Sequence, residues 1–490
     1  MLKLIPKESV TALQCIPLEL KEGALSVGVV DPEADGVRQG LHDLEQMTGY
    51  TIKPVLISAS GFAYAHKSYE LLVRENEGER PVVITHQNMA DLLGMIGHIE
   101  QDPTAHLNVT DLLTAVLASA VHQLASDIHF EPMETEFDVR LRIDGVLHNF
   151  LRRPIAEYRG LESRIKYLAK MPLGDTQSPQ DGRFTITVAD TPLDLRVASL
   201  PTVYGTMITV RLLPKDQVLL NLAQLGIRPD LEAPVRAAFS KPHGMILVTG
   251  PTGSGKTTTL YSILQELNTE ARKIITIEDP VEYKIAGLEQ SQVDPEREYG
   301  FAEALRGALR QDPDVLMIGE IRDKETANIG IRAALTGHIV LATLHSNSAP
   351  AAYSRLLEME VEPFLFSGSI NIVIAQRLLR LLCPHCKKQR DCTAEEKQLL
   401  EREIGRAPEQ TYDAVGCEQC SKIGYRGRTA IFEQFVPTHA IEQLALLHSS
   451  ISAFEAQAQK DGMTTMMQDG LLKVEQGITS LAEVYRVTAE

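Results

Sequence analysis

The chain has 490 residues, 44% of them hydrophobic and 23% charged, with a formal net charge of −17 at pH 7. This length allows about three domains of a soluble globular protein, and the acidic balance argues against nucleic acid as the main partner. We expect a cytoplasmic protein without structural disulfides, because the sequence lacks a long apolar run and a secretory signal pattern.

Residues 1–70 are predicted to form a small α/β domain. "ALSVGVV" and "TIKPVLIS" have the apolar patterns typical of strands, and "GVRQGLHDLEQMTG" between them is helical. The charged stretch "VRENEGERP" then predicts a linker, which we place at 71–105.

Residues 106–220 are predicted to form an α+β domain. "LNVTDLLTAVLASAVHQLA" has helical periodicity, whereas "FDVRLRIDGVLHNFL" alternates on both sides of Asp144-Gly145, which predicts a hairpin turn. "GRFTITV", "LDLRVASL" and "TMITVRLL" continue the alternating pattern. We therefore expect an antiparallel sheet with one exposed face.

The pattern changes in residues 221–490. "GMILVT", "KIITIE", "DVLMI" and "HIVLATL" are continuous apolar runs separated by segments of helical length. Strands that are buried on both faces have this pattern, which predicts an α/β domain with a parallel sheet.

"GPTGSGKT" after the first of these strands matches the phosphate-binding loop G-x-x-x-x-G-K-[ST]. Its glycines allow backbone N–H groups to converge on a phosphate at a helix N-terminus. Lys256 is expected to contact the β- and γ-phosphates of ATP, and the Thr257 hydroxyl to bind Mg²⁺. The predicted nucleotide-binding residues of this segment are Gly250, Pro251, Thr252, Gly253, Ser254, Gly255, Lys256, Thr257 and Thr258.

The acidic residues that follow the strands near this loop depart from the usual pattern. The strand "VLMI" ends in Gly319 and Glu320, where many nucleotide hydrolases have a metal-binding Asp. We assign Glu320 to the metal side of the site and Glu278, which ends the strand "IITIE", to orienting and deprotonating the attacking water. The alternative, that such acids cap helices or pair with Arg, stays open for Asp279 and Glu282.

Two further pairs of residues could respond to the phosphates. His338 and His345 bracket the strand "IVLATL", and we expect them to influence hydrolysis, although a lone His is more often structural. Arg306 and Arg310 lie four residues apart on one helix, where they could contact phosphate or pair with surface acids.

Two C-x-x-C motifs, Cys383–Cys386 and Cys417–Cys420, are separated by 30 residues. Two such knuckles predict a tetrahedral Cys₄ zinc site within a subdomain at 378–430, with redox disulfides as the alternative. Four protein ligands leave no open position, so the Zn²⁺ is expected to be structural. Cys15 and Cys392 are interpreted as ordinary thiols.

These motifs together resemble the ATPase family that powers type II secretion and type IV pilus assembly. The matching segments span residues 125–428 and are "ASDIHFEP", "LRIDG", "DGRF", "LRVASLPT", "GPTGSGKTTTLY", "ITIEDPVEY", "LRQDPDVLMIGEIRD", "TGHIVLATLHSN" and the paired knuckles. In that family the Walker B strand ends in Gly-Glu, and the strand "VLMI" does so here. The knuckles occur only in the family's assembly and secretion members, which argues against a retraction motor.

The resemblance implies a homohexamer with a RecA-like ATPase domain, preceded by a sensory-like (PAS-like) domain. ATP would bind between the two domains, and Arg196 and Arg211 would reach the phosphates. From the pattern alone, these two arginines would be interpreted as part of a solvated strand face. The N-terminal region matches only part of the family's N-terminal module and shows no clear "RLG" signature, so a cyclic dinucleotide is not predicted there.

The resulting functional hypothesis is a cytoplasmic ATPase motor that is peripheral at the inner membrane. Its N-terminal domain would dock onto an inner-membrane platform or its cytoplasmic-domain partners. The modest length and short N-terminal region favour type II secretion over the alternative, type IV pilus assembly. An ATP-binding scaffold with little turnover is a hypothesis of a different class, and a DNA-pumping motor is disfavoured by the acidic charge.

Overall fold

The computed structural model describes residues 5, 7–21, 24–34, 36–48, 50–66, 82–101, 107–213 and 220–489. The chain falls into two compact units. The first comprises Met1–Val121, Asp127–Leu141 and Asn149–Leu213, and the second comprises His122–Ser126, Arg142–His148 and Pro214–Glu490. None of the helices in these described ranges has the length and apolar character that a membrane crossing requires.

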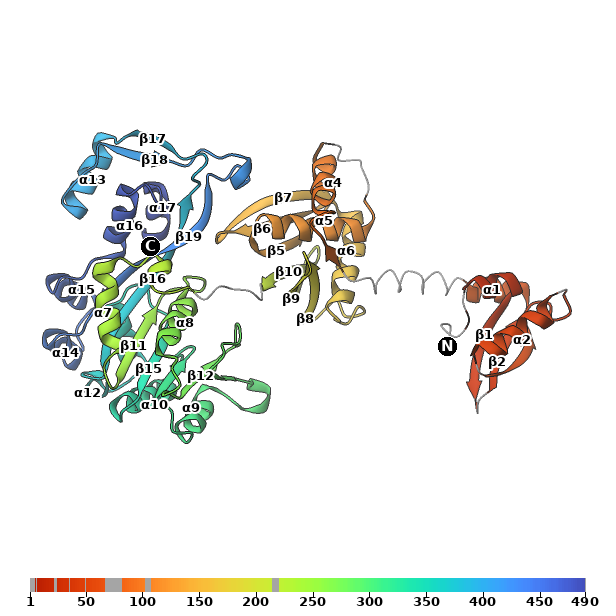
Figure 1. The fold of residues 1–490 in the computed structure, drawn as a ribbon, viewed down its shortest axis with the longest axis horizontal. Helices are drawn as coiled ribbons and strands as arrows, with labels where there is room; N and C mark the ends of the chain where they lie inside the picture. Colours follow the sequence, from red (N-terminus) through yellow and green to blue (C-terminus); the bar gives the residue numbers. More distant parts are fainter. Residues whose placement is uncertain are drawn as a thin grey trace. The chain divides into compact units, whose positions relative to one another are not determined.

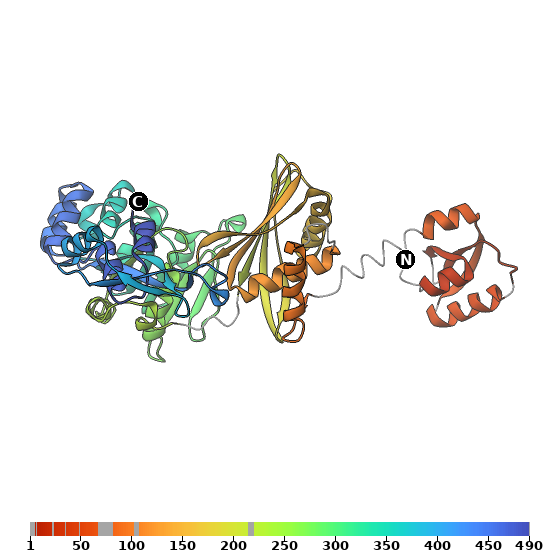
Figure 2. The same cartoon turned by 90° about the horizontal axis from the view of Figure 1, so that it is seen from above.

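The first unit contains two separate sheets (Figures 1 and 2). Its elements, wholly or mostly within the unit, are α1 (Lys7–Leu13), β1 (Cys15–Lys21), β2 (Ala24–Val29), α2 (Val37–Thr48), β3 (Thr51–Leu56), β4 (Val83–Ile84), α4 (Met89–Gln101), α5 (Val109–His122), β5 (Ala125–Pro132), β6 (Glu136–Ile143), β7 (Val146–Pro154), α6 (Ile155–Leu168), β8 (Gln180–Val188), β9 (Thr191–Thr202) and β10 (Gly205–Leu213).

The smaller sheet has the strand order β1-β2-β3, with β1 antiparallel and β3 parallel to β2. Its buried core includes Leu25, Val27 and Val29 of β2 together with Leu41 and Leu44 of α2. The strands and helix expected in residues 1–70 are therefore present, and α1 and β1 are additional elements.

The larger sheet has seven strands in the order β4-β8-β9-β10-β5-β6-β7. The pairs β8/β9, β9/β10 and β10/β5 are antiparallel, as expected. Helix α6 packs against the sheet through Tyr158, whose buried hydroxyl donates to the carbonyl oxygens of Phe130 and Thr206. The alternating pattern of β6 is also confirmed, because its apolar residues are buried and its charged residues are at least partly exposed.

The expected linker at 71–105 is only partly described, since residues 71–81 and 102–105 lie outside the described ranges. Residues 82–101 differ from the prediction, because they form β4 and α4, and β4 pairs in parallel with β8. Strand β4 of this stretch therefore belongs to the larger sheet. A strand of only two residues, Val83 and Ile84, is too short to give a periodic signal. The other domain boundaries stay predictions.

The second unit is built around another seven-stranded sheet (Figure 1). Its helices and strands are α7 (Pro229–Phe239), β11 (Gly244–Thr249), α8 (Lys256–Leu267), β12 (Ile274–Glu278), β13 (Glu289–Gln292), α9 (Phe301–Leu309), β14 (Val315–Ile318), α10 (Lys324–Leu335), β15 (Ile339–Leu344), α11 (Ala351–Glu358), α12 (Pro363–Phe366), β16 (Ile370–Leu382), β17 (Lys388–Asp391), α13 (Ala394–Ile404), β18 (Gln410–Asp413), β19 (Tyr425–Phe435), α14 (His439–Leu446), α15 (Ile451–Lys460), α16 (Met466–Glu475) and α17 (Leu481–Thr488).

This sheet has the order β13-β12-β14-β15-β11-β16-β19. The first six strands are parallel, as expected, but the edge strand β19 is antiparallel to β16. Every residue of β11, β14 and β15 is buried. Helices α7 and α8 pack on one face of the sheet, and α9, α10 and α11 pack on the other. Burial on both faces explains why these strands are continuously apolar.

Candidate functional site

The strand order places three functional segments at one edge of the second unit's sheet. Strand β15 lies between β14 and β11, and all three run in the same direction. Their carboxyl ends are therefore adjacent. Glu320 follows β14, His345 follows β15, and the phosphate-binding loop follows β11. Ligands of open parallel α/β sheets bind at this edge.

The phosphate-binding loop has the backbone conformation that its glycines allow. Gly250, Gly253 and Gly255 all have positive φ angles, of 148°, 80° and 88°. Gly255 caps the N-terminus of α8, so the loop leads directly into a helix start that favours an anion. The Lys256 ammonium donates to the carbonyl oxygens of Gly250 and Pro251 over 2.9 and 3.1 Å.

The electrostatics of Lys256 fit a site for an anion. Burial lowers the pKa of its amine, nearby Glu320 opposes that shift, and Arg377 adds to it. A bound polyphosphate would stabilise the charged form of Lys256. Pro251, Thr252 and Gly253 are exposed, Ser254 is buried, and Thr257 and Thr258 are half-buried at the start of α8.

Glu320 lies beside the loop in a small charged network. One carboxylate oxygen is 3.0 Å from Nε2 of His345, and the other accepts a hydrogen bond of 2.8 Å from Arg322. The side chain of Glu320 is 20% exposed, so solvent can reach it. Arg322 also pairs with Asp279 over 3.5 Å, which is the Arg-pairing alternative considered for that acid.

Gly319 has a structural explanation. A Cβ atom at this position would lie 3.0 Å from the carbonyl oxygen of Ile277 on β12. The Gly319 N–H donates to that same oxygen over 2.7 Å. The close approach of β14 to β12 disfavours a side chain here, and the first carboxylate beyond β14 belongs to Glu320.

Glu278 occupies a different environment from Glu320. It is only 2% exposed, and its carboxylate accepts hydrogen bonds from the Tyr261 hydroxyl, from Thr276 Oγ1 over 2.6 Å and from Gln290 Nε2 over 3.2 Å. Both oxygens are therefore engaged in a buried network. The role of water activation assigned to Glu278 stays a prediction, but the geometry favours Glu320 for it.

The two histidines are separated by the length of a strand. His345 follows β15 at the carboxyl edge and contacts Glu320, as described above. His338 precedes β15 at the amino edge, where its ring contacts the Ala333 carbonyl oxygen over 2.9 Å. Six residues of strand span roughly 20 Å. The influence of His338 on hydrolysis therefore stays a prediction, but this geometry favours His345 for that role.

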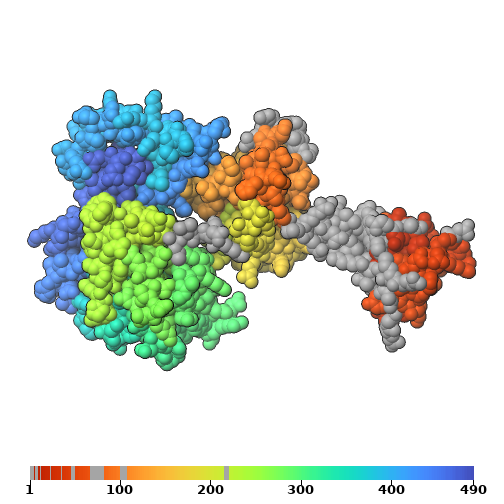
Figure 3. Space-filling view, viewed as in Figure 1, coloured from red at the N-terminus to blue at the C-terminus, as the bar shows by residue number. Residues whose placement is uncertain are grey.

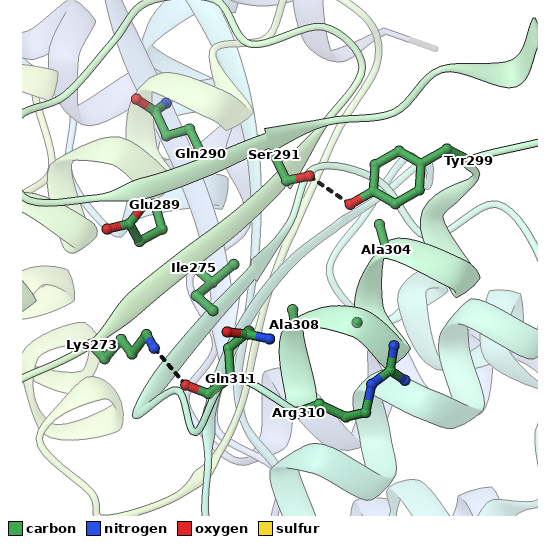
Figure 4. A pocket seen from close by; sticks show the side chains of 11 residues that line it. Lys273, Ile275, Glu289, Gln290, Ser291, Tyr299, Ala304, Ala308, Arg310 and Gln311 are labelled. Carbon is green, nitrogen blue, oxygen red and sulfur yellow. Dashed lines mark hydrogen bonds between the residues drawn. The ribbon is translucent and has the colours of Figure 1, made fainter. Parts of the chain in front are cut away.

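Arg306 and Arg310 lie at the C-terminal end of α9, where each contacts groups other than the loop. Arg306 pairs with Glu303 over 3.4 Å and with Glu325, the surface pairing considered as an alternative. Arg310 follows α9 and lines a cavity of about 490 Å³. Figure 4 shows this cavity between α9 and the strands β12 and β13, with Lys273 and Gln311 on its wall. A phosphate contact by either arginine stays a prediction.

Arg196 and Arg211 lie on neighbouring strands of the first unit. Arg196 on β9 is the register partner of Arg211 on β10 and also of Arg183 on β8. Asp127 on β5 is opposite Arg211 and bonds its Nε over 2.8 Å. Directly opposed like charges destabilise a sheet unless an anion compensates for them. Asp127 compensates Arg211 in this row. The phosphate contacts of Arg196 and Arg211 stay a prediction, and Arg183 was not identified from the sequence.

The four cysteines of the knuckles form one cluster. Their ligand atoms lie within 4.8 Å of one another, and three Sγ pairs are separated by 3.9, 3.8 and 3.8 Å. Tetrahedral zinc with bonds of about 2.3 Å places its sulfurs roughly 3.8 Å apart. Backbone N–H groups of Gly416 and Gly424 point at Cys386 and Cys420 over 3.3 and 3.2 Å, which stabilises thiolates. The donor set therefore fits Zn²⁺.

The cluster organises a small subdomain between β16 and β19. Cys383 follows β16, Cys420 precedes β19, and the insertion consists of β17, β18 and α13. This part, coloured light blue, lies at the surface in Figure 3. Helix α13 begins with a capping box formed by Thr393 and Glu396. Because the cluster joins two sheet strands, bound metal would hold the insertion on the sheet.

The fold and this edge of the sheet together define a nucleotide hydrolase with a phosphate-binding loop. The family model described as "Type II/IV secretion system protein" matches residues 102–486, and the model described as "MshEN domain" matches residues 1–76. The chain therefore belongs to the type II/IV secretion system ATPase family. It is an ATP hydrolase with a RecA-like ATPase fold.

Similar curated proteins carry names from two machines. The chain is 39% identical to "Type IV pilus assembly ATPase PilB" of Myxococcus xanthus, over 100% of this chain and 86% of that protein. It is 46% identical to "Type II secretion system protein E" of Aeromonas hydrophila, over 77% of this chain and 75% of that protein. "Type II secretion system ATPase E" of Vibrio cholerae is 44% identical, with 78% and 76% covered.

Solved structures share the fold. The pilus retraction motor PilT with bound ADP has a TM-score of 0.52 and 27% identity, covering 76% of this chain and 96% of PilT. The ATPase DotB of Legionella pneumophila has a TM-score of 0.57 and 23% identity, covering 79% of this chain and 97% of DotB.

Proposed function

We propose that this protein is the motor of a type II secretion system, in which ATP hydrolysis drives pseudopilus assembly through an inner-membrane platform. The observation that carries the proposal is the convergence of Lys256, Glu320 and His345 at one sheet edge in a member of the secretion ATPase family. Several relatives with 44–46% identity are named as type II secretion proteins.

In this proposal the loop amides and Lys256 bind the β- and γ-phosphates of ATP. Thr257 would hold Mg²⁺, which neutralises phosphate charge when it is bound. Glu320 orients and deprotonates the attacking water, because it is solvent-accessible and lies beside Lys256. His345, 3.0 Å from Glu320, positions that carboxylate. Glu278 holds α8 against β12 through Tyr261.

The proposed assembly is a homohexamer that works from the cytoplasmic side of the inner membrane. Arg196 and Arg211, joined by Arg183 in the same row, would meet the phosphates of bound ATP. The N-terminal region would dock onto a platform or cytoplasmic-domain protein of the machine. The cysteine cluster would hold zinc without taking part in the chemistry, because its four ligands leave no open position.

Type IV pilus assembly is the second candidate, and one observation favours it. The PilB relatives of Myxococcus xanthus and Pseudomonas aeruginosa align with 100% and 99% of this chain, whereas the type II relatives named above align with 77–78%. Deletion of the gene separates the two candidates. Loss of exoprotein release with intact surface pili supports secretion, and the reverse result supports pilus assembly.

The ATP-binding scaffold makes a different biochemical prediction. A motor should release more phosphate when the cytoplasmic part of its platform protein is added, and Lys256→Ala should abolish this release. A chain that binds ATP tightly but gives no stimulated release, with the platform bound, would instead support the scaffold.

A further inference from the structure

Strand β16 contacts the phosphate-binding loop through the side chain of Gln376. Its Nε2 donates to the carbonyl oxygen of Ser254 over 2.6 Å, and its Oε1 accepts a hydrogen bond of 2.7 Å from the Thr259 hydroxyl. Gln376 is only 1% exposed, so water does not compete for these bonds. The amide therefore ties the loop before Lys256 to the first turn of α8.

The loop also closes tightly around Gln376. A Cβ atom at Gly250 would lie 2.6 Å from the Gln376 carbonyl oxygen, and a Cβ atom at Gly255 would lie 3.0 Å from its Nε2. A side chain at Gly250 would meet this backbone oxygen as well as Ser254 Oγ, and a side chain at Gly255 would press against the amide. A buried amide that is bonded on both sides and enclosed in this way determines the shape of the loop.

Arg377, the next residue, contacts the other side of the site. Neighbouring strand residues point to opposite faces, so Arg377 lies on the face that Ala375 and Leu379 share with α9, α10 and α11. Its guanidinium donates to the carbonyl oxygen of Asn347 over 3.1 Å. Asn347 is two residues after His345, so this bond holds the segment that carries the histidine.

The same segment is fixed a second time from β19. Glu433 is buried, and its carboxylate accepts a hydrogen bond of 2.8 Å from the Ala349 N–H. Arg377 lies close enough to Glu433 and to Lys256 to affect the pKa of each group, although burial is the larger cause in both cases. The Arg377 guanidinium therefore contacts the segment after β15 directly, and its charge acts on Lys256 of the phosphate-binding loop.

We propose that Gln376 and Arg377 are a positioning pair for ATP hydrolysis, in which Gln376 sets the shape of the phosphate-binding loop and Arg377 sets the segment that carries His345. Because the two residues are adjacent on one strand, they fix the phosphate-binding loop and the segment that carries His345 relative to each other. This inference rests on the proposed function of the loop as the ATP site. It assigns the two residues different kinetic signatures.

The test compares full-length Gln376→Leu and Arg377→Lys with the matched control Gln434→Leu. Gln434 is also a buried amide, on the adjacent strand β19, but it donates to the carbonyl oxygen of Leu231 and does not contact the loop. Binding of a fluorescent ATP analogue and steady-state phosphate release are measured for each variant.

Gln376→Leu is expected to weaken analogue binding at least tenfold, or about 1.4 kcal/mol, whereas the Gln434→Leu control stays within about twofold of wild type. Arg377→Lys keeps the charge but loses the guanidinium geometry. It is expected to lower kcat at least about tenfold with KM within about twofold. Equal binding losses in Gln376→Leu and Gln434→Leu, or a normal kcat in Arg377→Lys, would overturn the proposal.

A second variant covers the case in which Gln376→Leu does not fold. Thr259→Val preserves shape but removes the hydroxyl that donates to Gln376. It should weaken analogue binding about threefold, and unchanged binding would overturn the role of Gln376. Wild type and Lys256→Ala are run in the same assay. Absent turnover in wild type contradicts the proposed ATPase motor, whereas normal wild-type turnover with unaffected variants contradicts only the positioning pair.

Discussion

Glu278 ends β12, and Glu320 follows the neighbouring strand β14. Substitution of each by Gln should nevertheless affect thermal stability and turnover in opposite ways. Glu320 is partly exposed, and its contacts are an Arg322 that is itself 57% exposed and His345. Exposed pairs of this kind contribute little to stability. We therefore expect Glu320→Gln to shift the melting temperature by less than about 2 °C while removing the group that accepts the proton of the attacking water.

The expected loss of turnover follows from that role. General-base catalysis contributes roughly 10²- to 10⁴-fold to an enzymatic rate, which corresponds to about 2.7–5.4 kcal/mol of barrier. Glu320→Gln should lower kcat within this range and leave the affinity for ATP almost unchanged, because Lys256 and the loop amides remain in place.

Glu278→Gln perturbs a buried network instead. The carboxylate accepts from three donors, on Tyr261, Thr276 and Gln290, and a glutamine NH₂ group would face at least one of them. An unsatisfied buried donor costs about 1–3 kcal/mol. The melting temperature should therefore fall, and the loss of turnover should be smaller than in Glu320→Gln.

The assay measures thermal unfolding and phosphate release for both variants and wild type under identical conditions. The reasoning is refuted if Glu320→Gln keeps more than about a tenth of the wild-type kcat. It is also refuted if Glu278→Gln abolishes turnover without any change in melting temperature.

Three further outcomes are expected. His345→Ala should lower kcat about tenfold because it leaves Glu320 unpositioned, whereas His338→Ala should leave kcat within about twofold; equal effects on steady-state turnover would contradict this assignment. Arg211→Ala should weaken ATP binding at least about fivefold, and unchanged binding would remove the row of arginines from the site. Metal analysis of natively purified protein should find about one zinc ion per chain, with Cys420→Ser losing the metal and melting earlier; a folded, zinc-free wild type would refute the Cys₄ site.

The elements of the ATPase domain could be predicted well from the sequence because each leaves a local signal. Strands β11, β12, β14 and β15 are short apolar runs, and the loop before α8 has a fixed spacing of glycines and lysine. The spacing of the cysteines within each knuckle predicts a metal site, and the clustered sulfur atoms support that prediction.

Local sequence patterns could not predict which end of a strand lies beside the phosphate-binding loop. His338 and His345 flank the same apolar run, yet only the direction of β15 decides which of them lies beside the loop. Glu278 likewise ends a strand, but its burial depends on Tyr261 and Gln290 from two other elements. Gln376 and Arg377 gave no signal, because their contacts exist only through the pairing of β16 with β11.

The clearest test of the account is ATP turnover by the purified full-length protein, measured as phosphate release with and without the cytoplasmic part of the platform protein. The account predicts slow release that rises when the platform is added, and no release above background from Lys256→Ala in either condition. Equal release by wild type and Lys256→Ala, or none from wild type with the platform bound, would contradict an ATP-driven motor built on this loop.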